Sequence, residues 1–318
     1  MNVAWGRMDF DLLREIAPNA NASAHDGPMK PAPFRYIAAR SLEAALAAKA
    51  QYGEDARFLA GGQSLVPAMN FRLAQPDVLI DINRLAELAA IKPGTDSVRI
   101  GALTRYRALE RDPTIARDLP LVAEALPEIA HPQIRNRGTL GGNLANADPA
   151  SEMPAIVLAL GGRLRARSAA GERWIEAEDF FVSALTTALA ADEMLVEIEL
   201  PRIPARTGSA FLEMSRRRGD FALIGVAAVV TLAADGACRD ARLALCGAGD
   251  RPVLAREAAQ SLIGSRIAAP DISEAAALVQ RAIDPHGNVH ASKAFQRHLA
   301  GVLTRRALAT ATERAHVH

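Results

Sequence analysis

Two short stretches of the sequence combine adjacent glycines with small polar residues, a pattern suited to binding an anion. The first glycine segment, residues 60–65, consists of Ala60, Gly61, Gly62, Gln63, Ser64 and Leu65. The second glycine segment, residues 138–143, has the sequence GTLGGN. Glycine permits positive φ and a close approach of the backbone, so successive N–H groups can converge on an anion. Together the two segments predict a site that holds a pyrophosphate from both sides.

Side chains of both segments add hydrogen-bonding groups to that site, namely Gln63, Ser64, Thr139 and Asn143. The plain alternative is that each glycine pair only forms a tight turn, which is the commoner use of such a pair. Neither segment is a Walker A motif, and no G-x-G-x-x-G stands between a predicted strand and helix. The residues alone therefore indicate a candidate nucleotide binder and no more.

Length and charge exclude several kinds of partner. The 318 residues exceed the usual size of one domain, which favours two or three packed units. Lys plus Arg number 37 and Asp plus Glu 36, so charge gives no argument for nucleic acid or an anionic membrane as the main partner. The longest apolar run, residues 223–234, is shorter than the roughly 18 to 20 residues of a membrane span. We find no secretory signal and expect a cytoplasmic protein.

Metal-ligating residues are sparse. The only cysteines are Cys238 and Cys246, whereas an iron–sulfur cluster normally takes four thiolates and a zinc site needs more ligands at closer spacing. The seven histidines include no H-E-x-x-H pair. We assign no metal to this chain.

The elements that position the two segments can be predicted from apolar spacing. A helix is expected over residues 42–51, with Ser41 as its N-cap and Gly53 beyond its end. Strands are expected over residues 57–60 and 78–82, and the intervening turn and helical stretch allow them to pair in parallel. Further along we expect a strand at 97–103, a helix at 119–129, and a long irregular stretch at 135–154.

The last part of the chain predicts a small antiparallel sheet with helices. Before it, residues 163–175 have the pattern of a hairpin and residues 194–200 that of a strand, followed by a boundary near residues 201–208. The strands expected after the boundary are 209–215, 224–233 and 239–246, and the helices are near 253–263, 271–283 and 292–314.

Three longer motifs resemble one protein family. They are AGGQSLVPAMNFRLAQPDVLIDINRL and IRNRGTLGGNLANADPASEMPA, which contain the glycine segments, and SRRRGDFALIGVAAVV at residues 215–230. In this order they are similar to the flavin-binding medium subunit of the molybdenum hydroxylases, the family of xanthine dehydrogenase and bacterial aerobic carbon monoxide dehydrogenase. The resemblance extends from about Met29 to the C-terminus.

The resemblance implies an α+β fold with a p-cresol methylhydroxylase-type FAD-binding domain, built from two α+β subdomains, and a C-terminal α+β domain. We expect an N-terminal extension at residues 1–28, the FAD-binding domain at 29–205 and the C-terminal domain at 206–318.

The resemblance also implies which residues hold FAD. The backbone of the first glycine segment, Ala60 to Leu65, would wrap the pyrophosphate, and the opposing loop would contain Gly138, Thr139, Gly141, Gly142 and Asn143. Thr104 matches a nucleotide-lining position. Glu152 stands where many relatives carry an Asp that hydrogen-bonds the ribityl chain. No catalytic residue is implied, because in this family the flavin performs the redox chemistry.

In the family, a large subunit with a molybdenum cofactor oxidises the substrate, and a small subunit passes electrons through two [2Fe–2S] clusters to FAD. The resemblance thus implies an electron-transferring oxidoreductase subunit in a dimer of heterotrimers. One alternative is a self-sufficient FAD-dependent oxidoreductase acting on a small molecule. Another is an assembly module that has lost FAD, although such a module would have no need of the two glycine segments.

Overall fold

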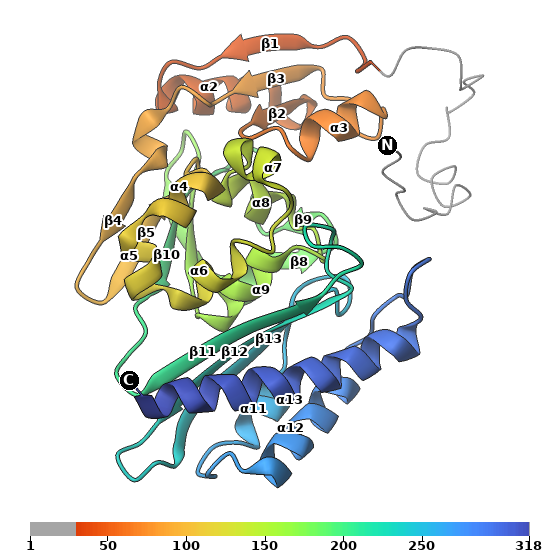
Figure 1. Cartoon of the computed structure of the whole chain (residues 1–318). Helices are drawn as coiled ribbons and strands as arrows, with labels where there is room; N and C mark the ends of the chain where they lie inside the picture. Colours follow the sequence, from red (N-terminus) through yellow and green to blue (C-terminus); the bar gives the residue numbers. More distant parts are fainter. Residues whose placement is uncertain (1–29, 318) are drawn as a thin grey trace.

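Three layers, each built on its own sheet, are stacked from top to bottom in Figure 1. The computed structural model describes residues 30–317, and the extension predicted over residues 1–28 lies outside them. The mixture of helices and separate small sheets is the predicted α+β class. No helix within residues 30–317 is both long and apolar enough to cross a membrane.

The upper layer is a three-stranded parallel sheet in the order β1-β3-β2. Its elements are β1 (Arg35–Ala38), α2 (Leu42–Tyr52), the 3₁₀ turn Gly53–Asp55, β2 (Ala56–Leu59), α3 (Leu65–Asn70) and β3 (Val78–Asp81). The Ser41 hydroxyl caps α2 by accepting from the Ala44 amide at 3.1 Å, and Gly53 ends the helix with φ of +53°. The predicted helix and the predicted parallel pairing are both confirmed.

The middle layer is a five-stranded antiparallel sheet in the order β4-β5-β10-β6-β7. Its strands are β4 (Ile91–Pro93), which follows the 3₁₀ turn Ala86–Ala89, β5 (Ser97–Gly101), β6 (Arg163–Arg167), β7 (Glu172–Glu176) and β10 (Met194–Pro201). Its helices are α4 (Tyr106–Arg111), α5 (Pro113–Asp118), α6 (Pro120–Ala125), α7 (Pro132–Arg137), α8 (Leu140–Asn146), α9 (Glu152–Ala159) and α10 (Ala177–Phe180), and a two-stranded ribbon joins β8 (Phe181–Ser183) to β9 (Thr186–Thr187). The hairpin and the strand predicted here are confirmed.

The prediction of a long irregular stretch at residues 135–154 is wrong. Most of it is helical, because it holds the end of α7, all of α8 and the start of α9. The Thr139 hydroxyl caps α8 by accepting from the Gly142 amide at 3.1 Å, and Ala147 ends it in the left-handed conformation. The helix predicted at 119–129 is shorter than expected and ends at Ala125.

The lower layer is an antiparallel sheet in the order β11-β12-β13-β14, as predicted apart from one strand. Its elements are β11 (Thr207–Met214), β12 (Ile224–Leu232), β13 (Cys238–Cys246), β14 (Val253–Leu254), α11 (Arg256–Gln260), α12 (Ala269–Ala282) and α13 (Lys293–Val317). β14 takes the place of the first residues of the helix predicted near 253–263.

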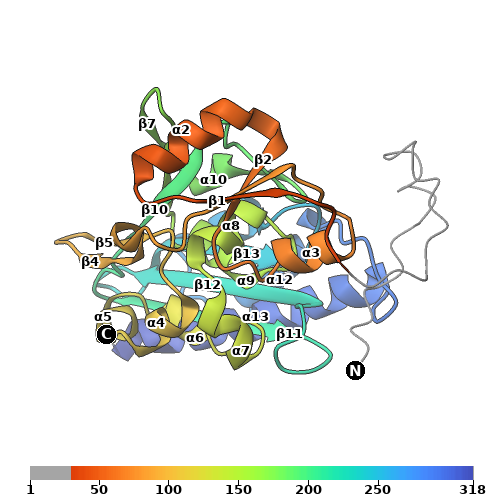
Figure 2. The same cartoon turned by 90° about the horizontal axis from the view of Figure 1, so that it is seen from above.

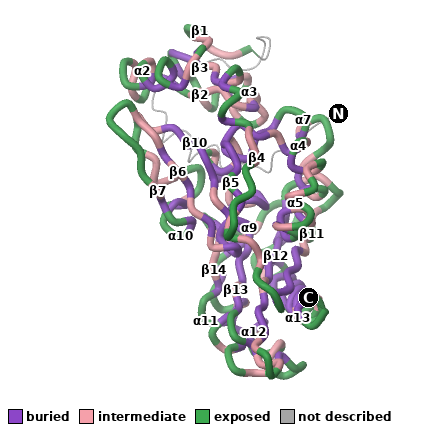
Figure 3. The backbone as a smooth tube through the Cα atoms, turned by 90° about the vertical axis from the view of Figure 1, so that its left-hand side faces the viewer, coloured by how far each residue is buried: buried purple, intermediate pink, exposed green. Residues whose placement is uncertain are grey.

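Both faces of the lower sheet are buried, which joins the lower and middle layers. Successive side chains of a strand point to opposite faces. Phe211, Ala227 and Cys246 belong to the core of the middle layer, whereas Val226 and Leu245 belong to the core formed with α11, α12 and α13. In Figure 3 the buried backbone accordingly continues from the middle layer into β12 and β13.

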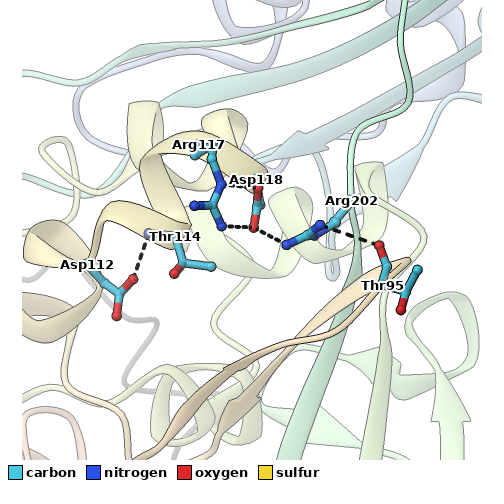
Figure 4. A network of polar contacts seen from close by, with 6 residues as sticks. All are labelled: Thr95, Asp112, Thr114, Arg117, Asp118 and Arg202. Carbon is cyan, nitrogen blue, oxygen red and sulfur yellow. Dashed lines mark hydrogen bonds and ion pairs between the residues drawn. The ribbon is translucent and has the colours of Figure 1, made fainter.

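The chain segment that connects the middle and lower layers is held by ion pairs (Figure 4). Asp118, at the end of α5, accepts from Arg117 Nε at 2.7 Å and from Arg202 Nη2 at 2.7 Å. Arg202 Nη1 also reaches the Thr95 carbonyl oxygen at 3.5 Å. The hydrogen bond from Arg117 lowers the pKa of Asp118, so this carboxylate stays charged and keeps the connection fixed.

Candidate functional site

The two glycine segments meet where the upper layer rests on the middle one, near α3 and α8 in Figures 1 and 2. The point of contact is Gly61. A Cβ atom built on Gly61 would lie 2.5 Å from the Arg137 carbonyl oxygen and 2.9 Å from the Gly138 Cα. Only glycine allows the two backbones to approach this closely, so the segments that the sequence singled out do lie side by side.

Two side chains fasten this contact, and sequence reasoning missed both. Asn83 Nδ2 donates to the Ala60 carbonyl oxygen at 2.8 Å. Arg105 donates to Asn83 Oδ1 and to the Arg137 carbonyl oxygen, and so links the end of β2 to the end of α7. Asn83 directly follows the predicted strand at 78–82 and Arg105 directly follows Thr104. A search for polar residues at strand ends would have found them.

The first glycine segment presents free backbone amides. Among the described residues, the N–H groups of Gly61, Gly62, Gln63, Ser64 and Leu65 donate to no other protein group. Gly62 has φ of +74°, and Gln63 Nε2 donates to the Gly61 carbonyl oxygen at 3.0 Å. Backbone donors seek partners, and a run of unpaired amides in a glycine turn suits an anionic group.

The second glycine segment, in contrast, is packed. Gly141 donates to the Ala102 carbonyl oxygen at 2.8 Å, and a Cβ on Gly141 would lie only 2.4 Å from the Ala102 Cβ. Leu140 donates to the Thr104 carbonyl oxygen at 3.0 Å, and Asn143 Nδ2 donates to Ser151 Oγ at 2.6 Å. Gly141, Gly142 and Asn143 all lie in α8. The glycines of this segment let α8 sit against the strand end that leads to Thr104.

Several buried polar atoms around the second segment have no partner in the described part of the chain. They are Thr104 Oγ1, Tyr106 Oη and Asn143 Oδ1. Tyr106 lies beneath the segment, because its amide donates to the Gly138 carbonyl oxygen at 3.1 Å. Buried polar groups are normally hydrogen-bonded, so this group of atoms fits a ligand that is rich in hydroxyl and phosphate oxygens.

Carboxyl groups with raised pKa values border the same region. Glu152, the first residue of α9, is 4% exposed. Burial, with the neighbouring charges of Asp148 and Glu128, raises the pKa of Glu152 to about 7. Glu213 lies near the end of β11, and burial together with the charges of Glu152 and Glu128 raises its pKa to about 8. Sequence reasoning missed Glu213, because one acidic residue in a strand gives no signal of burial.

The donor set fits FAD. The free amides of the first glycine segment suit its pyrophosphate, and the unpartnered atoms of Thr104, Tyr106 and Asn143 suit hydroxyl groups. Within residues 30–317, no group of three or more His, Cys, Asp or Glu side chains is arranged to hold a metal ion.

Comparison with known proteins agrees with this geometry. Residues 32–203 match the family described as FAD binding domain in molybdopterin dehydrogenase, and residues 209–311 match the CO dehydrogenase flavoprotein C-terminal domain. The chain is 43% identical over 287 residues to the 6-hydroxypseudooxynicotine dehydrogenase complex subunit alpha of Paenarthrobacter nicotinovorans, covering 90% of this chain and 97% of the relative.

Two further known proteins match a comparable share of this chain. The caffeine dehydrogenase subunit beta of Pseudomonas sp. strain CBB1 is 40% identical over 287 residues, covering 90% of this chain and 97% of the relative. The fold is similar to a chain in the crystal structure of the Cu,Mo-CO dehydrogenase, with a TM-score of 0.87 and 36% identity, covering 89% of this chain and 99% of that chain.

Proposed function

The chain belongs to the FAD-binding medium subunits of the molybdenum hydroxylases, and we propose that within such an enzyme it carries electrons from an iron–sulfur partner subunit to an external acceptor. It is thus an oxidoreductase subunit with FAD as its own cofactor. The observation that carries the proposal is the first glycine segment, whose five amides donate to no other group among the described residues and lie against the second segment.

The protein's own contribution is to hold and orient the cofactor. The amides of Gly61 to Leu65 would bind the pyrophosphate, Thr104 and Asn143 would accept or donate hydrogen bonds along the nucleotide, and Glu152 would border the ribityl chain. When bound, FAD supplies both one-electron and two-electron redox chemistry. The hydrogen bonds of Asn83 and Arg105 join the two sides of the site.

We further propose that the partners are a small subunit with two [2Fe–2S] clusters and a large subunit with the molybdenum cofactor, assembled in the cytoplasm as a dimer of heterotrimers. The similar protein of Paenarthrobacter nicotinovorans is by name the alpha subunit of a dehydrogenase complex. Three large apolar side chains follow the first glycine segment on and just after α3 and are 41–52% exposed: Val66, Phe71 and Leu73. Exposed apolar groups of this kind are typical of a surface that contacts another protein.

The test is to purify the full chain from its native host under mild conditions, and then to identify the released cofactors and every co-purifying polypeptide. The proposal expects FAD, an iron–sulfur polypeptide and a molybdenum polypeptide in equal amounts. Rapid mixing with the substrate of the large subunit should then bleach the iron–sulfur absorbance and the flavin absorbance in succession. FAD without any partner would instead support a self-sufficient oxidoreductase, and absence of FAD would contradict both readings.

A test variant and a matched control make the partner experiment specific. Substituting Phe71→Ser and Leu73→Ser changes the exposed apolar surface without touching the first glycine segment. We expect this variant to retain FAD and to lose the partner polypeptides. The matched change Ile263→Ser removes an apolar side chain that is 39% exposed after α11, in the lower layer, and should retain both.

A further inference from the structure

The basic loop, residues 215–222 between β11 and β12, carries three consecutive arginines that the FAD site does not use. Its sequence, SRRRGDFA, sets three cations against one carboxylate. Arg216, Arg217 and Arg218 are all exposed. Within the described part of the chain, Arg216 and Arg217 form no ion pair, and Arg218 meets only Glu128, at 3.4 Å with its side chain 71% exposed. Most of the positive charge of this loop therefore faces solvent.

The loop between α12 and α13 lies beside the basic loop. The buried side chain of Gln296 joins the two segments, because its Nε2 donates to the Leu223 carbonyl oxygen at 2.9 Å and its Oε1 accepts from the Gly287 amide at 2.9 Å. Arg216 Nη1 also lies 3.4 Å from His290 Nε2. The two loops therefore form one surface that a buried side chain holds together.

Apolar side chains are exposed on the same two loops. Phe221 in the basic loop is 57% exposed, and Val289 in the second loop is 61% exposed. Met214, just before the basic loop, and Phe295, in the first turn of α13, are exposed as well. Aromatic side chains and arginines are enriched where proteins contact one another, and a few of them supply most of the binding energy. This surface suits a protein partner better than a small molecule.

The basic loop rests against the helix that leads to the contact between the glycine segments. A Cβ atom on Gly219 would lie 2.6 Å from Nδ1 of His131, which is the N-cap residue of α7. α7 has six residues, a length of about 9 Å at the usual helical rise, and ends at Arg137, whose carbonyl oxygen touches Gly61. One short helix thus separates the basic loop from the first glycine segment.

On the premise of the proposed function, we propose that the basic loop is the docking surface for an acidic electron-carrier protein, which is the external acceptor. Charge complementarity selects this class of partner, because exposed cations attract an acidic protein and speed its approach. Encounters with electron carriers are transient and bury little surface, whereas permanent subunit interfaces are larger and more apolar. Each encounter moves one electron from reduced FAD to the carrier. Two encounters therefore reoxidise FAD, and the protons that reduced FAD carries leave to solvent.

The test measures binding of soluble cytochrome b5, an acidic one-electron carrier, to the holoenzyme, which is the chain with FAD and both partner subunits. By surface plasmon resonance, we expect the Kd to rise at least about tenfold between about 20 mM and about 200 mM salt. The double variant Arg216→Gln, Arg217→Gln should bind about tenfold more weakly at low salt. The matched control Arg305→Gln, Arg306→Gln removes two exposed charges from α13 and should stay within about twofold of the unmodified holoenzyme.

A kinetic measurement connects this surface to electron transfer. The holoenzyme is reduced by anaerobic titration with dithionite and is then mixed with oxidised cytochrome b5 or with the small dye dichlorophenolindophenol. In the Arg216→Gln, Arg217→Gln variant, we expect the rate of haem reduction at low salt to fall about tenfold. The rate with the dye should stay within about twofold, because a small dye needs no charged docking surface.

Three results would overturn the proposal. Equal affinities of the two double variants would show that the position of the arginines does not matter. Binding of cytochrome b5 to the unmodified holoenzyme that is absent or unaffected by salt would exclude charge complementarity. Loss of the iron–sulfur or molybdenum polypeptide from the Arg216→Gln, Arg217→Gln variant would assign the surface to a permanent subunit. The proposed function itself would fail differently, through absence of FAD or of both partner polypeptides from the unmodified preparation.

Discussion

The two glycine segments have similar compositions but different physical roles. In the first, the amides of Gly61 to Leu65 donate to no other group among the described residues. In the second, every amide from residue 138 to residue 143 except that of Thr139 donates within the protein. The comparison teaches that adjacent glycines can serve a ligand where their amides remain free, even though Gly61 also lies against the backbone of Arg137, and that they serve packing where their amides are already bonded within the protein.

The difference predicts opposite consequences for substitution. In the second segment a new side chain should damage the fold, because Gly141 touches the backbone that leads to Thr104. In the first segment it should damage cofactor binding more than the fold, because the turn itself contributes little to the core.

The largest effect is expected from Gly141→Ala. Its Cβ would lie 2.4 Å from the Ala102 Cβ and 2.7 Å from the Ala102 Cα, and neither α8 nor the end of β5 can move freely. We expect the free energy of unfolding without FAD to fall by about 3 kcal/mol, as measured by urea denaturation. The control Gly249→Ala places its Cβ 3.6 Å from its nearest neighbour and should change stability by less than about 1 kcal/mol. Equal losses of stability in the two variants would contradict the packing role of the second segment.

Gly61→Ala should mainly weaken FAD binding. The added Cβ would meet the Arg137 carbonyl oxygen at 2.5 Å and push the two segments apart, which moves the free amides away from their common target. We expect the Kd for FAD to rise by at least about tenfold, with a loss of stability of roughly 1 to 2 kcal/mol. Fluorescence titration with FAD checks the first value and urea denaturation the second. An unchanged Kd would contradict the role of the first segment.

The pH dependence of stability probes the two carboxyls with raised pKa values, Glu152 and Glu213. The pKa values of Glu152 and Glu213, about 7 and about 8, lie above the ordinary value of 4.5, so the folded chain binds more protons than the unfolded one. Stability without FAD therefore falls as pH rises from about 4.5 to about 8. As pH rises, the free energy of unfolding of Glu213→Gln should increase relative to that of the unmodified chain. We expect this difference to grow by roughly 1 kcal/mol per pH unit at most, because the half-buried Glu213 is partly screened by solvent. Urea denaturation at successive pH values measures this difference. If the free energies of unfolding of the two chains change in parallel with pH, the prediction is wrong.

The smallest effect is expected from Thr139→Val, which removes the N-cap of α8. The Gly142 amide then loses its acceptor at 3.1 Å, and the free energy of unfolding should fall by about 1 kcal/mol. Thr139→Ser keeps the hydroxyl and should restore most of the loss. Because this cap belongs to packing, we expect the Kd for FAD to change by less than about threefold in both variants. A larger loss of affinity in Thr139→Val alone would show that the second segment contributes to binding through Thr139 as well as through the side chain of Asn143.

Much of the fold could be predicted because its local signals agree with its packing. Ser41 and Gly53 mark the ends of α2, and the alternating strands of the lower sheet were recognisable from their spacing. Residues 135–154 misled the prediction because glycine and asparagine disfavour helix. The Thr139 cap and the contact of Gly141 with Ala102 override that preference, and the contact cannot be read from local propensity because it joins residues distant in sequence.

The site was predictable only in part for the same reason. Adjacent glycines next to small polar residues gave the two segments, and the longer motifs gave their family. Asn83 and Arg105 could not be found in this way, because they act by joining chain ends that are distant in sequence. Glu213 could not be found because its burial depends on the packing of middle-layer helices against the lower sheet, with α6 against β11 and α9 against β12 and β13, and no local pattern predicts this packing.

The most direct test of the contrast between the two segments is hydrogen–deuterium exchange of the full chain with and without saturating FAD, read by mass spectrometry on peptides that cover residues 58–66 and 138–146. If the first segment binds FAD through its backbone, the amides of Gly61 to Leu65 exchange rapidly in the free chain and become protected by FAD, whereas the second peptide is already protected and changes little. Protection confined to the second peptide, or none in the first, would contradict this account.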